Sequence, residues 1–244
     1  MADIKAYYKN SSYSKQRTYD GSNAVLSYQK KVIKSQLACS DKVILDIGCG
    51  CAPISSLVAK RNKVIGMDIS ESALRIATQN GVCGVLANIE EKFPFNDKEF
   101  DFVLLTEVIE HVFDPLALIG EIHRIIKDRG VLICSAPNAS FILNRLVFLF
   151  TGLFDDCTAK ERLIGGSDYI SEHIRAMSPK LLKRLLIDSG FLMEKTDYWF
   201  PDRFISKQFS GLSFIAKLIK GLRLHQIFPN LISLSFCMVV VKDA

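Results

Sequence analysis

The middle of the chain alternates short apolar runs with amphipathic stretches. The apolar runs have the length and composition of strands that are buried on both faces of a parallel sheet. We predict strands at 43–47, 63–67, 84–87, 102–105 and 131–135. Helical spacing and helix start signals predict intervening helices at about 55–60, from Ser70 onward, and over 115–126. Strands that alternate with helices indicate an α/β fold with a doubly wound parallel sheet.

The two flanks of this region have a different pattern. Residues 1–20 are polar and rich in tyrosine, as in a lid or arm, and residues 22–38 have helical spacing. Beyond Pro137 we expect an apolar helix at 141–154, a helix from Ser178 to about Ser189, an amphipathic helix ending near Leu222, and two more strands, 191–198 and 234–241. We therefore predict one domain over 1–244, divided into an N-terminal arm and helix (1–38), a cofactor-binding core (40–138), an insertion that covers the acceptor side (138–177) and the C-terminal part of the sheet (178–244).

Composition narrows the class of protein. The 244 residues are 49% hydrophobic and 23% charged, which suits an ordered globular core, and the formal charge of +5 is too mild to predict a nucleic-acid partner. The cysteines are odd in number and form no paired framework, as expected for reduced thiols. The first residues form no apolar signal segment, and no apolar run reaches 18 residues. We expect a cytoplasmic location.

A glycine turn between two acidic strand ends carries the chemistry. Asp46 closes the first apolar run, Gly48 and Gly50 follow it, and Asp68 closes the second run. The turn lacks the Gly-Lys-Ser/Thr ending of a phosphate loop. Pro53 removes a backbone N–H that a dinucleotide pyrophosphate would use, and Asp46 would repel that group, although Asp68 stands at the distance expected for an NAD site. S-adenosylmethionine, which has an ammonium, a sulfonium and a ribose but no phosphate, suits these residues better.

The ordered motifs resemble those of class I S-adenosylmethionine-dependent methyltransferases, in particular the group that includes ubiquinone-biosynthesis O-methyltransferases and glycan-cluster methyltransferases. The matching segments are 45–50, 66–68, 88–95, 100–103, 107–112 and 137–138, with weaker similarity at 172–175 and 185–191. The resemblance implies a Rossmann-like sheet of seven strands whose last strand is antiparallel.

The resemblance also implies roles for individual residues. Asp46, Gly48 and Gly50 would line the methionine end of the cofactor, and Asp68 would hold the ribose. The rest of the implied cofactor set is Ile69 against the adenine, Asn88 in place of the family's usual aspartate, Ile89 and Glu107. Asn88 can still accept a hydrogen bond from the adenine amino group through its side-chain oxygen.

Catalysis by methyl transfer to a hydroxyl requires a base, and His111 is our candidate because it lies just beyond the fourth predicted strand. A purely structural role for His111 is the alternative. A second alternative places Glu107, Glu110 and His111 on one helical face, where His173 could join them around a divalent cation, as in quinol and small-RNA 2′-O-methyltransferases. We predict no metal site, because the same pentapeptide occurs in relatives that bind no metal.

The function predicted is methylation, at oxygen, of a small-molecule or glycan- or lipid-linked acceptor. The alternatives are a regulatory module that binds S-adenosylmethionine without turnover, the metal-assisted enzyme and, less well supported, an NAD-dependent oxidoreductase.

The apolar segments 141–154 and 209–224 have basic residues at their edges. The simpler interpretation is a cover packed on the sheet or a dimer contact, because amphipathic helices usually face a core. A peripheral contact with a membrane is the other. The sequence carries no signal for the oligomeric state.

Overall fold

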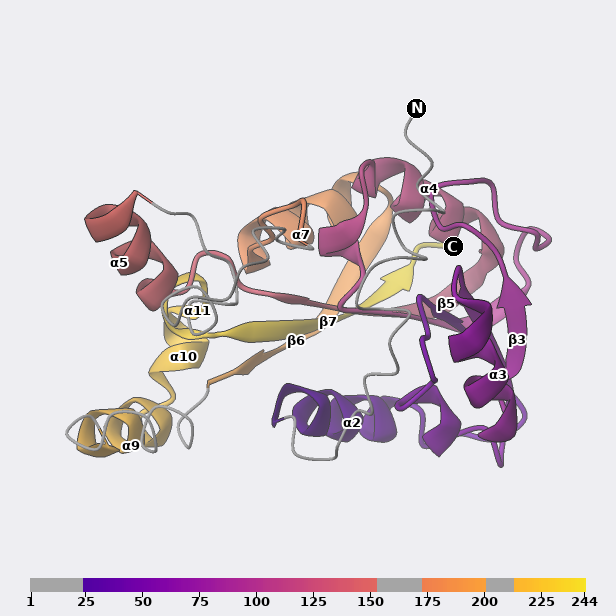
Figure 1. Cartoon of the computed structure of the whole chain (residues 1–244), viewed down its shortest axis with the longest axis horizontal. Helices are drawn as coiled ribbons and strands as arrows, with labels where there is room; N and C mark the ends of the chain where they lie inside the picture. Colours follow the sequence, from indigo (N-terminus) through magenta and orange to yellow (C-terminus); the bar gives the residue numbers. More distant parts are fainter. Residues whose placement is uncertain (1–23, 153–172, 201–212) are drawn as a thin grey trace.

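A seven-stranded mixed sheet forms the centre of the molecule (Figure 1). The computed structural model describes residues 24–152, 173–200 and 213–244. The strand order is β3-β2-β1-β4-β5-β7-β6. The strands are β1 (Val43–Ile47), β2 (Lys63–Asp68), β3 (Cys83–Leu86), β4 (Phe100–Thr106), β5 (Ile126–Pro137), β6 (Phe191–Trp199) and β7 (Ser235–Lys242). The last strand, β7, runs antiparallel to both of its neighbours, so the predicted fold is confirmed.

Helices cover both faces of the sheet because the strands are apolar on both sides. On one face lie α2 (Ala24–Gln36) and α3 (Glu71–Gln79), whose Ile33 and Ala77 share a core with Ile44 of β1. On the other lie α4 (Pro115–Ile125) and α7 (Pro179–Asp188), whose Ile119 and Leu186 are fully buried. Figure 1 shows α2 on one side of the sheet and α4 and α7 on the other.

Three helices begin at the capping residues that the sequence predicts. Ser70 accepts a hydrogen bond from Ala73 N at the start of α3, and Ser178 does the same for Leu181 N at the start of α7. Asp114 accepts from two backbone N–H groups at the start of α4, where proline occupies the first turn. These three predicted helix starts are confirmed.

The helix predicted at 55–60 is wrong. The structure has a single 3₁₀ turn, η1 (Ser55–Leu57), closed by hydrogen bonds from Leu57 N to Ile54 O and from Val58 N to Ser55 O. The segment between the glycine turn and β2 is too short to repay the cost of nucleating an α-helix. The turn therefore ends after three residues.

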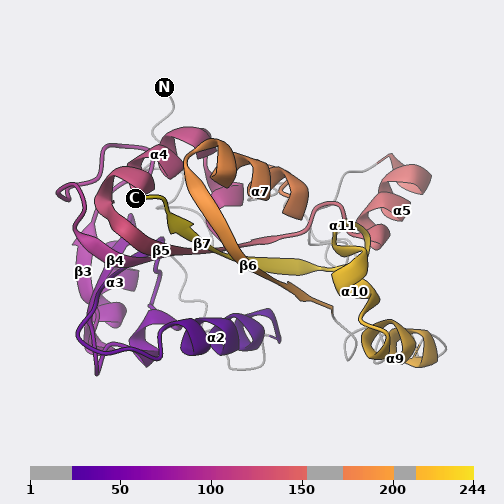
Figure 2. The ribbon, with the colours of Figure 1, turned by 180° about the vertical axis from the view of Figure 1, so that it is seen from behind.

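A separate group of helices lies beyond the carboxyl end of β5. It comprises α5 (Ile142–Thr151), α9 (Ser213–Gly221), α10 (Leu224–Ile227) and α11 (Pro229–Ile232). Buried Asn138, just after β5, donates to Ser233 O at 2.7 Å and to Pro229 O at 3.1 Å, which fastens α11 to the strand end. Figures 1 and 2 both show these helices at one end of the molecule. No helix among the described residues is long and apolar enough to cross a membrane.

Parts of the sequence predictions lie outside the described residues. These are the arm at 1–20, residues 153–172 of the insertion, and Phe209 and Leu212 of the amphipathic helix. The four-part division of the domain therefore stays a prediction.

Candidate functional site

The two acidic strand tips lie on neighbouring strands at the same edge of the sheet. β1 and β2 are parallel with Asp46 opposite Gly66, so Asp46 and Asp68 both stand near the carboxyl ends. Asp46 is buried, and its Oδ2 accepts a hydrogen bond of 2.6 Å from Ser55 Oγ. Asp68 accepts from Gly50 N through Oδ2 and from Ser70 N through Oδ1, both at 2.8 Å. Its carboxylate thus fixes the glycine turn against the tip of β2.

The glycine turn requires its glycines for two reasons. Gly48 and Gly50 both have positive φ, at 65° and 51°, a conformation that L-residues rarely adopt. A Cβ on Gly48 would lie 2.6 Å from Val108 Cγ2, whereas a Cβ on Gly50 would meet no atom within 4 Å. The backbone at Gly50 is therefore open on the side where a ligand could approach.

Burial raises the pKa of both carboxyl groups at this edge above the value of a free carboxylic acid. Burial raises the pKa of Asp46, the Ser55 hydrogen bond lowers it and the charge of Asp68 raises it, so that the pKa lies at about 7. The pKa of Asp68 is raised by burial too, while its backbone donors lower it. A cationic group placed between the two would favour both ionised forms. This is the electrostatic match expected for an ammonium or sulfonium ligand.

The geometry does not suit a pyrophosphate. In dinucleotide sites the phosphates rest on the amino terminus of an α-helix that follows the glycine turn. Here the turn is followed by Pro53, which has no N–H, and by the three-residue η1. The buried carboxylate of Asp46 is hydrogen-bonded to Ser55 of η1.

The remaining predicted cofactor residues follow β2 and β3. Ile69 is half-buried directly after Asp68, and Ile89 packs against the main core. Asn88 Oδ1 accepts from Glu90 N at 3.1 Å, and its Nδ2 donates to Glu91 Oε1. One lone pair of the Asn88 oxygen is therefore used locally, and the other is available for a donor such as an adenine amino group.

Glu107 occupies a strained position at the end of β4. Its φ is 54°, and its Oε1 accepts from Gln29 Nε2 at 2.7 Å and from Ser135 Oγ at 3.0 Å. Burial raises the pKa of Glu107 to about 7, while the Ser135 hydrogen bond, the charge of His173 and the Gln29 hydrogen bond lower it. Glu107 is thereby held in one orientation by a helix and a strand that are distant in sequence.

His111, Glu110 and His173 lie together next to this network. The His111 Nε2 is 3.9 Å from Glu110 Oε1, and the rings of His111 and His173 are 4.8 Å apart. One ligand atom from each of the three side chains lies within 4.8 Å of the other two. The backbone N–H groups of Ile174 and Arg175 both donate to Glu110 O, which holds His173 against the turn.

The prediction that Glu107, Glu110 and His111 share a helical face is wrong. The segment forms a 3₁₀ turn, η2 (Ile109–His111), and the left-handed Glu107 precedes it. Glu110 and His111 are consequently paired with His173, while Glu107 belongs to the Gln29–Ser135 network. Gln29 has no local sequence signal that marks it as a functional residue. Ser135, as a polar residue ending an apolar strand, could have been noticed.

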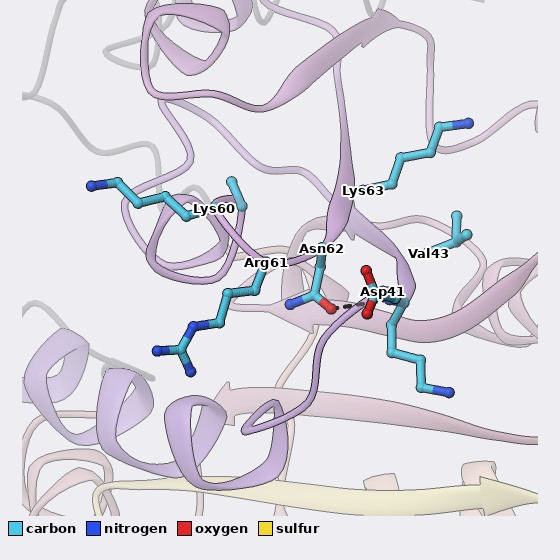
Figure 3. Close-up of a pocket in the computed structure, with 8 residues that line it drawn as sticks. Asp41, Val43, Lys60, Arg61, Asn62 and Lys63 are labelled. Atoms are coloured by element: carbon cyan, nitrogen blue, oxygen red, sulfur yellow. Dashed lines mark hydrogen bonds between the residues drawn. The ribbon is translucent and has the colours of Figure 1, made fainter.

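The pocket in Figure 3 lies at the opposite, amino edge of the sheet. It has a volume of about 470 Å³ and is lined by residues 41–43 and 59–63. The long side chains of Lys60, Arg61 and Lys63 point away from one another (Figure 3), so they do not converge on a shared anion. This pocket is therefore separate from the acidic strand tips.

Comparison with known proteins finds one matching family and several relatives. Residues 45–134 match the methyltransferase domain family. A demethylmenaquinone methyltransferase of Geobacillus stearothermophilus is 29% identical over 132 residues, covering 48% of this chain and 56% of the relative. A ubiquinone biosynthesis O-methyltransferase of Hydrogenovibrio crunogenus is 32% identical over 116 residues, covering 45% of this chain and 48% of the relative. The chain thus spans about half the length of the curated relatives it matches.

A solved structure supports the fold over the whole chain. The methyltransferase in an activator complex from Haloferax volcanii superposes with a TM-score of 0.65 at 15% identity, covering 100% of both chains. The fold is Rossmann-like, and its carboxyl edge carries Asp46 and Asp68 at the glycine turn. Residues 45–134 are thus similar to a methyltransferase domain, and they lie on a fold that a methyltransferase shares.

Proposed function

We propose that this protein transfers a methyl group from S-adenosylmethionine to a hydroxyl of a small-molecule or of a glycan- or lipid-linked acceptor. The observation that carries the proposal is the buried Asp46 carboxylate on the strand that leads into the glycine turn, whose Gly50 has an open face. A buried acid with a pKa near 7 favours a cationic ligand, and the open backbone at Gly50 allows that ligand to come close. The six described cysteines are free thiols, which fits the cytoplasmic location that forms part of this proposal.

The roles proposed for the residues divide between binding and proton transfer. Bound S-adenosylmethionine supplies a methyl carbon that its sulfonium has already activated. Asp46 and the glycine turn would hold the methionine end, and Asp68 would hold the ribose. The Asp68 oxygens each accept one backbone hydrogen bond already, and each keeps a further lone pair for a ribose hydroxyl.

His111 would take the proton of the acceptor hydroxyl. It is 9% exposed at the end of β4, next to the strand ends that carry the acids. Because methyl transfer is an in-line displacement, alignment of donor and acceptor supplies much of the rate, and the base adds to it. The quinone-pathway relatives act on small molecules, which supports an acceptor of that size.

The test is turnover. The purified chain is incubated with S-adenosylmethionine and a panel of quinols, sugars, lipid-linked sugars and RNA, and S-adenosylhomocysteine is measured as the product. Methylation of a hydroxyl in a small-molecule or glycan- or lipid-linked compound is the expected result. Donor binding by calorimetry with no turnover on any acceptor would favour the regulatory module instead.

A metal-assisted reaction is the second candidate, because Glu110, His111 and His173 bring one carboxylate and two imidazoles together. Such a set fits a divalent cation with mixed nitrogen and oxygen ligands, which would polarise a diol or catechol acceptor. His111 would then be a ligand and could not act as the base, so the two candidates exclude each other.

Metal binding separates them. If a cation is used, Mn²⁺ binds with one site per chain, His173→Ala weakens that binding, and EDTA abolishes turnover. His123→Ala is the matched control, since His123 lies on α4 and packs against Phe191 of β6. If His111 is the base, EDTA leaves turnover unchanged.

A further inference from the structure

The helices beyond the carboxyl end of β5 expose many large apolar side chains. We name this surface the end platform and define it by α5, α9, α10 and α11. Its most exposed apolar side chains are Phe150 at 79%, Phe214 at 75% and Leu149 at 72%, and Leu218, Ile227 and Phe228 are exposed as well. A gathering of large exposed apolar side chains at one end of a molecule marks a binding surface more often than an ordinary exterior.

The contrast between α5 and α7 shows that α5 does not act as a cover for the core. Both helices have ten residues, but α7 buries Leu182 and Leu186 completely, whereas no residue of α5 is buried. In Figures 1 and 2, α7 lies along the sheet and α5 stands away from it. The sequence interpretation of this helix as packed on the sheet is therefore wrong, and its apolar side chains face outward.

The charges of the end platform have one sign. Arg145 lies on α5, Lys217 and Lys220 lie on α9, and Arg223 lies just before α10. The described segments 138–152 and 213–234 contain no aspartate or glutamate. A two-fold contact between copies of the chain would bring these cations against their own counterparts, which is unfavourable. An anionic partner with an apolar interior matches both properties.

The end platform is also fixed to the edge of the sheet where the candidate site lies. Asn138 follows β5, and its amide donates to the carbonyls of Pro229 and Ser233 at the ends of α11. Ala139 N donates to Met177 O, which joins the same strand end to the segment that carries His173. A surface bound to the end platform would thus lie next to the carboxyl edge.

We propose that the end platform binds the interfacial layer of a bilayer that contains anionic lipid. Phe150, Leu149 and Phe214 enter the boundary between headgroups and acyl chains, and the lysines and arginines contact the anionic headgroups. Delivery of a lipid-linked acceptor to the site rests on the methyl transfer proposed above, but the bilayer contact itself does not depend on it.

Vesicle co-sedimentation tests this contact with the full chain and with matched variants. The vesicles are pure phosphatidylcholine or phosphatidylcholine with phosphatidylglycerol. One pair of variants is Leu149→Glu/Phe150→Glu against Leu86→Glu/Ile187→Glu, which changes exposed residues on β3 and α7. The other pair is Lys217→Glu/Lys220→Glu against Lys60→Glu/Lys63→Glu at the amino edge. Circular dichroism and calorimetry with S-adenosylmethionine check the fold and donor binding of every variant.

The expected result is binding to phosphatidylglycerol vesicles that weakens in salt of about 0.5 M. Each end-platform variant should bind at least about tenfold more weakly, and each control should bind as the unchanged chain does. The proposal is overturned if the unchanged chain does not bind these vesicles, or if the controls lose as much binding. It is also overturned if sedimentation velocity shows a dimer that Leu149→Glu/Phe150→Glu dissociates. Vesicle binding without donor binding would leave this proposal standing and remove the proposed function.

Discussion

The end platform lies next to the carboxyl ends of β1, β2 and β4. The two regions differ in the kind of side chain that each one buries and exposes. At the strand ends, polar side chains are buried and held by specific hydrogen bonds, as with Asp46 to Ser55 and Glu107 to Gln29. On the end platform, apolar side chains are exposed, and α5 buries none of its residues. The strand ends are suited to hold one small polar ligand in one orientation. The end platform is suited to contact a wide surface without fixing how that surface is oriented.

This difference indicates which region of the fold determines the specificity of ligand binding. Buried carboxylates are expensive unless each oxygen has a partner or a ligand, so their positions are tightly constrained. An exposed apolar residue can be replaced by another with little effect on the fold. We therefore expect changes at the strand ends to act on donor binding or chemistry, and changes on the end platform to leave donor binding unchanged.

The largest effect is expected from His111→Ala. If His111 is the base, turnover falls by about 10²–10⁴-fold while donor affinity stays within about twofold. Steady-state kinetics and calorimetry measure the two quantities separately, with His123→Ala as the control. Unchanged turnover would remove His111 from the reaction.

The next effect is expected from Asp68→Ala. The substitution removes the acceptor of the Gly50 and Ser70 N–H groups as well as the proposed ribose partner, so donor affinity falls at least about 100-fold. Calorimetry measures the loss. Glu71→Ala, which changes an exposed acid three residues away, should bind the donor normally. Equal losses in both variants would contradict a specific role for Asp68.

Asn138→Ala tests the connection between the two regions. The buried carbonyls of Pro229 and Ser233 lose their donor, and we expect a fall of about 2–4 kcal/mol in the free energy of unfolding. Urea denaturation measures this change, and Asn96→Ala, at an exposed position, is the control. Donor affinity of the folded variant should stay within about twofold, and a larger loss would mean that the regions are not separable.

The smallest effect is a pH dependence carried by Asp46. Its pKa in the free protein is raised to about 7, so the carboxylate that attracts the cationic donor is lost as the pH falls below that value. From pH 7.5 to pH 6 the ionised fraction, and with it the donor affinity, should fall by about eightfold. Asp46→Asn should abolish this dependence.

The raised pKa of Asp46 affects the free energy of unfolding in the opposite direction with pH. Because the folded pKa lies above the unfolded one, the folded state binds more protons between about pH 4 and pH 7, and the free energy of unfolding falls as the pH rises through that window. Thermal melting of the unchanged chain against Asp46→Asn measures this, and a slope that is equal in both would contradict it.

The sheet could be predicted from the sequence because the signals for its strands and for the helix caps come from residues that are close together in the chain. Runs such as 43–45 and 102–105 are apolar throughout, and caps such as Ser70 and Asp114 sit within three residues of the N–H groups they bind. The acids at the strand ends were found for the same reason. Parallel strands bring their carboxyl ends to one edge whatever the loops do.

The rest depends on contacts between distant residues. Gln29 meets Glu107 across 78 positions, and Asn138 meets Ser233 across 95, and neither pair has a periodic signal. The turn at 109–111 was expected to be helical, but the left-handed Glu107 before it changes the direction of the chain. The outward orientation of α5 could not be predicted either, because its apolar pattern is equally compatible with a core.

The most direct test of the central claim is a calorimetric titration of the purified chain with S-adenosylmethionine and, separately, with NAD⁺. Two acidic strand ends beside a turn with no pyrophosphate site predict one S-adenosylmethionine bound per chain, weaker binding in Asp46→Asn, and no measurable NAD⁺ binding. Tight NAD⁺ binding, or S-adenosylmethionine binding that Asp46→Asn leaves unchanged, would contradict the account.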